Sequence, residues 1–289
     1  MARTAEKADA EVAAPGAALP TVTAVYGGGG PFGITYGLGV ADALLDLGVP
    51  LRSAPSLGTS AGAWVASCLA TNTTFETLCE LPAIRVPNPT PGFLRGMGRE
   101  LFGAARSDLV RACAVRVPSG RPVILSGAKH DLADLVAASS AVPWLFPPVR
   151  IGRRLYADGG VRSLVHADKS AAARHLVVVA PIAGPMFGRG GRAMEVMLRR
   201  ELRRWRQRTG GMAHLIRPDS RIASLARHPL DLFDKDRTAA AYPMAYQQAS
   251  QLASNWSALS QLATGDAMGT ADTRTPPPGA REAAPLVAV

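Results

Sequence analysis

The sequence predicts an α/β fold in which helices cover both faces of a mostly parallel central sheet, a three-layer α/β/α arrangement. From residue 21 onward, strand-like apolar segments alternate with helix-like segments, an order typical of parallel sheets covered by helices. The segment 176–180 reads LVVVA, a continuous apolar run suited to a strand that is buried on both faces. Apolar residues make up 47% of the 289 residues and charged residues 19%, which are the proportions of an ordinary globular protein.

The expected elements follow one another in βαβα order. An apolar strand at 21–26 leads through a glycine-rich turn into an Ala/Leu-rich helix that ends near residue 47. A second strand at 51–57 leads through another glycine turn into a helix that ends near residue 69. Short strands are also expected at 123–125 and 155–157.

We expect one domain over residues 20–264, because 289 residues suit a single α/β unit with tails. Residues 1–19 are Ala-rich and charged, and residues 265–289 contain three consecutive prolines without an apolar period. Both ends are therefore predicted to be disordered tails.

The charge and cysteine content limit the classes of partner. Lys and Arg total 32 against 22 Asp and Glu, a net charge of +10, and such a surface attracts lipid headgroups or nucleic acid. No motif that reads DNA or RNA is present, so no nucleic-acid partner is expected. Three cysteines without CxxC spacing argue against a disulfide framework and a structural zinc site. We expect neither a metal nor a cofactor, and the sequence gives no indication of the oligomeric state.

A basic amphipathic helix is expected at 194–208, with Met, Leu and Trp at helical spacing among many arginines. The arginines that could face anionic lipid are Arg199, Arg200, Arg203 and Arg204. The alternative is a domain helix whose apolar stripe packs on the sheet while its arginines are solvated. No apolar run of about 18 residues and no signal-peptide core occur, so we expect a cytoplasmic location, with peripheral membrane contact left open.

A glycine-rich turn, residues 27–33 (GGGGPFG), lies directly between the first strand and the first helix. Consecutive glycines let backbone N–H groups turn toward one point, where they can hold an anion. The same letters satisfy GxGxxG, but a dinucleotide site also needs an acidic residue at the end of the second strand. Residues 52–54 there read RSA. A turn that binds no ligand is the other alternative.

A GxSxG pentapeptide, Gly58 to Gly62, lies between a predicted strand and a predicted helix. This context is typical of a nucleophile elbow, whose turn is so tight that larger residues at the flanking glycines would collide with neighbouring backbone. Ser60 would then be exposed at a helix N-terminus, where the dipole favours developing negative charge.

A serine hydroxyl needs a base to become nucleophilic. Asp158 with one of four histidines would make an ordinary triad, but none of these histidines lies in a glycine-flanked motif. Asp158 instead ends a predicted strand and precedes Gly159 and Gly160, which permit close approach of another loop, so its carboxylate could contact Ser60 directly. A hairpin turn is the alternative interpretation of Asp-Gly-Gly. The four histidines are His166, His175, His214 and His228.

With these blocks in order, the sequence resembles the patatin-like phospholipases over roughly residues 20–264. The stretch 138–149 (ASSAVPWLFPPV) is similar to the family's Ser/Ala/Pro-rich block ahead of its aspartate motif. The resemblance implies a Ser–Asp dyad without a catalytic histidine, Ser60 being the nucleophile and Asp158 the base. It further implies an oxyanion hole formed by the backbone of Gly28, Gly29, Gly30 and Ala61.

The function that this resemblance implies is a serine lipid acyl hydrolase of the phospholipase A or lysophospholipase type, cleaving carboxylic esters through an acyl-enzyme. Its substrate would be a phospholipid or another acyl ester. One departure from the family pattern is Phe32, where the glycine loop usually carries Arg or Lys. Two alternatives stay open: a carboxylesterase or thioesterase acting on soluble esters, and a catalytically silent basic protein that binds membranes.

Overall fold

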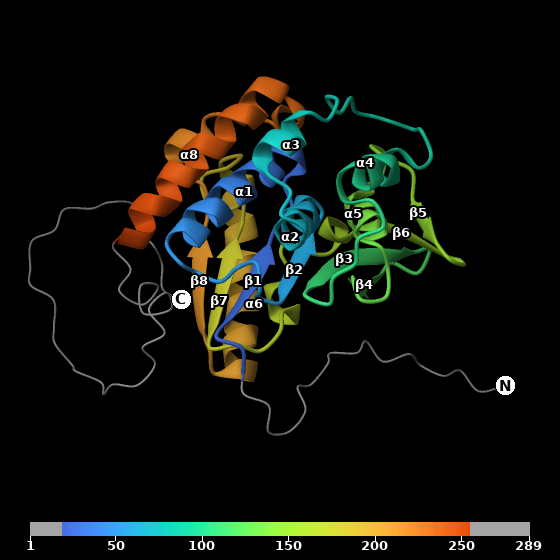
Figure 1. Ribbon diagram of the computed structural model, residues 1–289. Helices are drawn as coiled ribbons and strands as arrows, with labels where there is room; N and C mark the ends of the chain where they lie inside the picture. The colour runs from blue at the N-terminus through green and yellow to red at the C-terminus, as the bar shows by residue number, and fades with distance from the viewer. Residues whose placement is uncertain (1–18, 255–289) are drawn as a thin grey trace, which may run out of the picture.

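The computed structural model describes residues 19–254 (Figure 1). Apart from Leu19, the two predicted tails lie outside these residues. Within them, no helix combines the length and the apolar character needed to cross a membrane.

One sheet of eight strands forms the centre of the described part, in the order β5-β6-β3-β2-β1-β7-β8, with β4 paired to β3. Strands β3, β2, β1, β7 and β8 pair in parallel, whereas β4 and β6 pair with β3, and β5 with β6, in antiparallel fashion. The strands are β1 (Val22–Tyr26), β2 (Ser56–Thr59), β3 (Val110–Val117), β4 (Arg121–Ser126), β5 (Val149–Ile151), β6 (Arg154–Asp158), β7 (His175–Val179) and β8 (Met212–Ile216).

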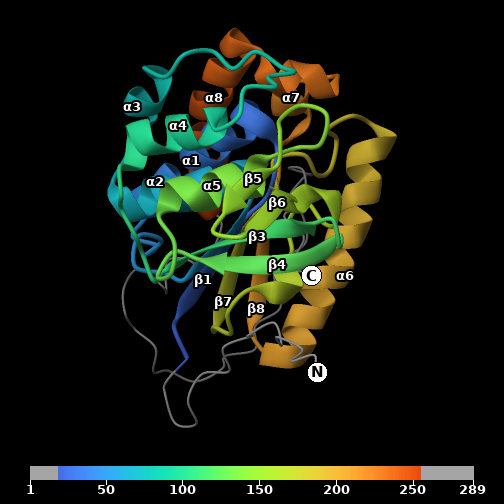
Figure 2. The same cartoon turned by 90° about the vertical axis from the view of Figure 1, so that its right-hand side faces the viewer.

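Helices cover both faces of the sheet. Figure 2 shows α6 along one face and α1, α2 and α5 on the other, so the predicted three-layer α/β fold is confirmed, with a mixed sheet whose antiparallel strands gather at one end. The helices are α1 (Gly30–Asp46), α2 (Ala61–Thr71), α3 (Phe75–Cys79), α4 (Phe93–Phe102), α5 (Leu132–Ser140), α6 (Arg189–Thr209), α7 (Ser220–Ala223) and α8 (Lys235–Ser254). Short 3₁₀ turns span Gly159–Val161, Ala167–Lys169 and Pro229–Phe233.

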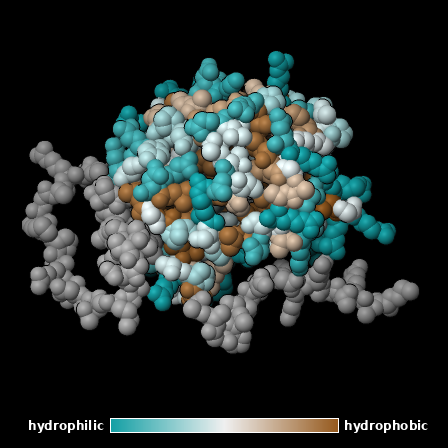
Figure 3. All heavy atoms as spheres, viewed as in Figure 1, coloured by the Kyte–Doolittle hydropathy of each residue, from teal (hydrophilic) through white to brown (hydrophobic). Residues whose placement is uncertain are grey.

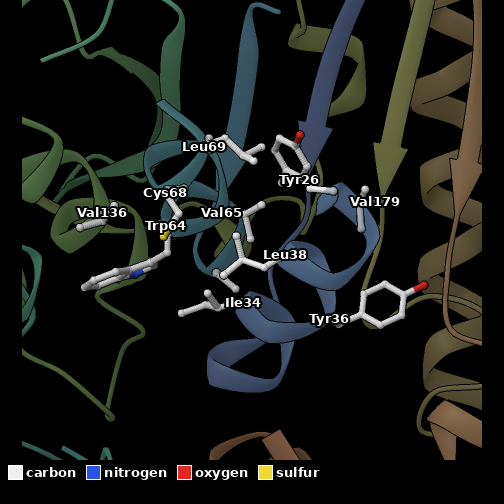
Figure 4. Close-up of a cluster of buried hydrophobic side chains, with 14 of the residues drawn as sticks. Tyr26, Ile34, Tyr36, Leu38, Trp64, Val65, Cys68, Leu69, Val136 and Val179 are labelled. Carbon is white, nitrogen blue, oxygen red and sulfur yellow. The ribbon is translucent and has the colours of Figure 1, made fainter. Parts of the chain in front are cut away.

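Two apolar cores result because successive side chains of a strand point to opposite faces. On β7, Val177 and Val179 join the core beneath α1 and α2, whereas Leu176 and Val178 join the core beneath α6. The LVVVA run is therefore buried on both faces, as predicted. Figure 4 shows part of the first core, with Leu38 of α1 and Val65 of α2 among its side chains.

The second predicted strand was placed too early in the chain. Residues 51–54 form a turn, in which the Ala54 N–H donates to the Leu51 carbonyl (3.4 Å), and β2 begins only at Ser56. Pro55 intervenes and has no N–H for a sheet ladder. Leu51 is apolar because it is buried in the core beneath the helices, not because it belongs to a strand.

Candidate active site

The sheet brings Ser60 and Asp158 together at one point along β3. Strand β2 runs parallel to β3, and its last residue Thr59 pairs with Cys113. Strand β6 runs antiparallel to β3, and its last residue Asp158 pairs with Ala114. Because β4 occupies the other edge of β3, β2 and β6 approach each other along the same edge and end at adjacent positions.

Ser60 lies in a strained turn between β2 and α2, with φ 52° and ψ −120°. A Cβ at Gly62 would lie 1.8 Å from the Tyr26 carbonyl oxygen, and one at Gly58 would lie 2.3 Å from the Ala63 nitrogen. Both positions therefore exclude any side chain, which is the steric requirement of a nucleophile elbow. Ser60 therefore belongs neither to β2 nor to α2, and its backbone conformation is strained.

Ser139 of α5 fixes the turn at Ser60 to the sheet. Its hydroxyl accepts the N–H of Ser60 (2.8 Å) and donates to the Cys113 carbonyl (2.6 Å). Ser139 is fully buried, so water does not compete for these bonds. The sequence placed Ser139 within the Ser/Ala/Pro-rich block but gave no signal for this contact.

Asp158 is 3% exposed, and this burial raises the pKa of its carboxyl group to about 6. Hydrogen bonding from the Ser60 side chain and from the Gly160 N–H (2.5 Å) opposes the increase by stabilising the charged form. A Cβ at Gly159 would lie 2.5 Å from the Cys113 carbonyl oxygen, which explains the first glycine of the Asp-Gly-Gly motif. The carboxylate is ionised at neutral pH, yet basic enough to accept a proton.

The glycine loop contributes fewer free donors than the sequence suggested. The N–H of Gly28 donates to the Leu164 carbonyl (2.8 Å), so the expectation that Gly28 donates to an oxyanion is corrected. Among the described residues, no backbone or side-chain acceptor takes the N–H groups of Gly29, Gly30 or Ala61. Gly30 and Ala61 are the first residues of α1 and α2, whose opening N–H groups have no partner within the helix.

A cavity of about 780 Å³ opens above these groups. Ser60, Asp158, Ala61 and the glycine loop line its floor, and its walls are mainly apolar, including Trp64, Leu94, Met97, Leu145, Phe146 and Phe233. A cavity of this size and character suits an apolar ligand with one polar reacting group. Two helix N-termini meet at the floor, where their dipoles favour a negative charge.

The histidines of the predicted alternative triad do not reach this floor. His166 faces Thr59 (Nδ1 to Oγ1, 3.3 Å), and burial lowers its pKa to about 4. His175, the first residue of β7, and His214, in the middle of β8, bond to each other (3.0 Å), whereas Ser60 follows the end of a strand. His228 is exposed before a 3₁₀ turn. None of the hydrogen bonds found within residues 19–254 joins a histidine to Ser60 or Asp158.

Helix α6 packs on the sheet through Leu198, Leu202 and Trp205, which are buried. This is the packing expected for the alternative of a domain helix with an apolar stripe. Arg199 is half-buried and pairs with Glu195 (2.6 Å). Arg200, Arg203 and Arg204 are exposed, and their contact with lipid stays a proposal. No cluster of three or more His, Cys, Asp or Glu side chains suited to a metal ion occurs in the described part of the chain.

Residues 116–168 match the sequence profile of a family described as patatin-like phospholipase. The predicted family resemblance is confirmed. The patatin-like segment includes Asp158 and the Ser/Ala/Pro-rich block. Ser60 and the glycine loop lie outside this segment in the sequence, and the fold brings them close to it. The match points to a lipid acyl hydrolase.

No curated protein sequence matches the chain. Among solved structures, VipD from Legionella pneumophila aligns with 82% of this chain and 67% of its own, at 13% sequence identity and a TM-score of 0.37.

Proposed function

We propose that the protein is a serine lipid acyl hydrolase of the phospholipase A or lysophospholipase type, with Ser60 as nucleophile and Asp158 as base. The observation that carries the proposal is the meeting of the β2 and β6 ends, which puts a strained serine beside a buried carboxylate under an apolar cavity. The substrate is an ester whose acyl chain occupies that cavity.

In the proposed mechanism, Asp158 takes the proton of the Ser60 hydroxyl while Oγ attacks the ester carbonyl carbon. The carbonyl oxygen becomes an oxyanion, stabilised by the free N–H groups of Gly29, Gly30 and Ala61. Asp158 then returns its proton to the departing alcohol, which leaves an acyl-enzyme. Water attacks this ester with Asp158 again as base, releasing the fatty acid and restoring the hydroxyl of Ser60.

The oxyanion donors are expected to contribute strongly to the rate, each by less than a residue of the dyad. Removing one preorganised donor from such a site commonly slows the reaction by about 10²–10³-fold. The proposed donors are backbone groups at two helix starts, so they stay in place before substrate arrives and need no reorganisation. Phe32, which stands where the family usually has a basic residue, is buried in the core. The presence of Phe at this position leaves the backbone donors unaffected.

Labelling with a fluorophosphonate probe tests the proposal directly, because the probe phosphonylates an activated serine. We expect one labelled peptide, containing Ser60, together with release of fatty acid from a panel of phospholipids and lysophospholipids. Hydrolysis confined to short soluble esters would favour the carboxylesterase alternative. A folded protein that is neither labelled nor active on any ester would contradict the proposal.

A dyad without imidazole predicts tolerance to histidine replacement. We expect His175→Gln, His214→Gln and His228→Gln each to keep ester hydrolysis within about threefold of the parent, because no proton passes through these rings. His166→Gln and His214→Gln require a check of folding by circular dichroism, since both side chains are buried. Any single histidine variant that stays folded and loses activity as Asp158→Asn does would replace the dyad by a triad.

A further inference from the structure

Large apolar side chains are exposed around the mouth of the cavity. Trp144 is 94% exposed, Leu230 is 68% and Val161 is 56%, and all three line the cavity above Ser60. Met197, 52% exposed, lines an adjoining pocket of about 250 Å³ that also includes Val161. We name these four residues the mouth surface. Only four other large apolar residues of the described chain are exposed: Leu19, Leu47, Val196 and Met212.

The exposure of Trp144 is built into the backbone. Trp144 has φ 66°, a left-handed conformation that is strained for a bulky residue. The turn around it is closed by the Leu145 and Phe146 N–H groups, which both donate to the Val142 carbonyl (3.1 and 2.9 Å). The Asn88 N–H donates to the Leu145 carbonyl (2.8 Å) and joins the turn to a second loop. A tryptophan held outward in this way loses the free energy that burying its ring would supply.

We infer that the mouth surface docks the protein onto the surface of aggregated lipid, so that substrate passes from the lipid layer into the cavity. The inference rests on the proposed function. Indole rings favour the boundary between headgroups and acyl chains, and the apolar cavity behind Trp144 continues the acyl environment down to Ser60. A water-soluble substrate would need no exposed apolar ring at this entrance.

Basic and acidic residues both lie beside the mouth surface, and the basic ones attract anionic lipid. Lys235 lines the cavity and Arg162, next to Val161, lines the adjoining pocket, and both are exposed. Each basic residue close to an anionic leaflet contributes about 1 kcal/mol of attraction. Figure 3 shows one face of the molecule, on which apolar residues are exposed between hydrophilic ones.

Arg203 and Arg204 of α6 lie farther from this surface, whereas Arg200 is only one turn from Met197. Helix α6 starts after the C-terminal end of β7 and finishes before the start of β8. It therefore runs from the C-terminal ends of these strands, where Ser60 lies, toward their N-terminal ends. Arg203 and Arg204 follow Met197 by two turns, or about 10 Å along the axis. Their charge adds long-range attraction, whereas the mouth surface makes the contact.

Vesicle sedimentation tests the inference, with every protein carrying Ser60→Ala so that lipid is not consumed. We use vesicles of phosphatidylcholine with phosphatidylglycerol and compare the triple variant Trp144→Ser, Val161→Thr, Leu230→Gln with its parent. The partition coefficient is expected to fall at least about tenfold. Met212→Gln is the matched control, because Met212 is 50% exposed but lies at the start of β8, and its coefficient is expected to stay within twofold.

Tryptophan emission gives a second measurement, which reports the environment of the ring itself. Trp64 and Trp205 are buried, and the fourth tryptophan, Trp256, which lies outside the described residues, is replaced by Phe in every protein measured. A blue shift on adding vesicles is then expected to come from Trp144 and to disappear in Trp144→Phe. Equal partitioning of the triple variant and its parent would overturn the inference. So would loss of binding in Arg200→Gln, Arg203→Gln, Arg204→Gln while the mouth variant still binds.

The failure of the inference and that of the proposed function are distinguishable. Hydrolysis of a monomeric short-chain ester by the protein with Ser60 intact tests the chemistry alone. Activity on this ester, combined with vesicle binding that the mouth-surface substitutions do not change, overturns the docking inference and leaves the proposed hydrolase function standing. Binding through the mouth surface without any esterase activity overturns the hydrolase, and with it the passage of substrate into the cavity.

Discussion

Ser60→Ala is expected to lower ester hydrolysis by at least about 10⁴-fold and to abolish fluorophosphonate labelling, while the protein remains folded. Loss of the proposed nucleophile would disable every step of the acyl transfer, and comparable serine deletions cost about 10⁶-fold in rate. The fold tolerates the change because the backbone N–H of residue 60 still donates to Ser139, which holds the elbow in place. Initial rates on a short-chain ester, with thermal unfolding as the folding check, measure both expectations.

Ser67→Ala is the matched control for this prediction. Ser67 lies on α2, two turns after Ser60, and is fully buried, and its hydroxyl has no hydrogen-bond partner among the described residues. It does not line the cavity. The control is expected to keep full activity and labelling. Turnover by a folded Ser60→Ala protein, at a rate close to that of Ser67→Ala, would disprove the assignment of the nucleophile.

The local part of the site could be predicted from the sequence because steric rules act between neighbouring residues. Gly58 and Gly62 are glycines because any Cβ would strike nearby backbone, so the elbow is visible as a spacing. The position of Asp158 after a strand could be predicted for the same reason. Alternation of strands and helices gave the layers, since each strand buries both of its faces.

Contacts between distant segments that no motif marks could not be predicted. The Leu164 carbonyl takes the N–H of Gly28 across a separation that leaves no pattern in the sequence, so Gly28 was counted among the oxyanion donors. The same holds for Ser139, whose hydroxyl reaches Ser60 from another helix. Trp144 and Leu230 belong to one surface only because two loops meet at the cavity. Apolar letters alone indicate burial, and these two residues are exposed.

The pKa of Asp158 predicts how activity depends on pH. The proposed base must be ionised in the free enzyme, so kcat/KM is expected to rise with pH through about 6 and then level off. Asp158→Asn removes the base and is expected to lower hydrolysis by about 10⁴-fold or more at pH 8. Asp168→Asn is the control, because that carboxylate lies in the following segment outside the cavity, and it is expected to leave the pH profile unchanged.

Asp158→Asn is also expected to stabilise the protein at neutral and alkaline pH. The folded-state pKa of about 6 lies above the ordinary value of 3.8, so folding favours the protonated carboxyl group and penalises the ionised one. Below pH 3.8 the group is protonated in both states and carries no penalty. As the pH rises from 3.8 to 6, the folded state binds more protons than the unfolded state, and stability falls. The full penalty, about 3 kcal/mol from the difference between the two pKa values, applies above pH 6.

Asp158→Asn therefore separates function from stability in one variant. Its amide oxygen can still accept the Gly160 N–H, so the turn stays intact while the buried charge disappears. Denaturant unfolding at pH 8 and at pH 4 measures the effect: the variant is expected to be more stable than the parent at pH 8, by up to about 3 kcal/mol, and nearly equal to it at pH 4. A variant that is inactive but equally stable at both pH values would mean that Asp158 is not held as a raised-pKa carboxylate, and its role as the base would lose its physical support.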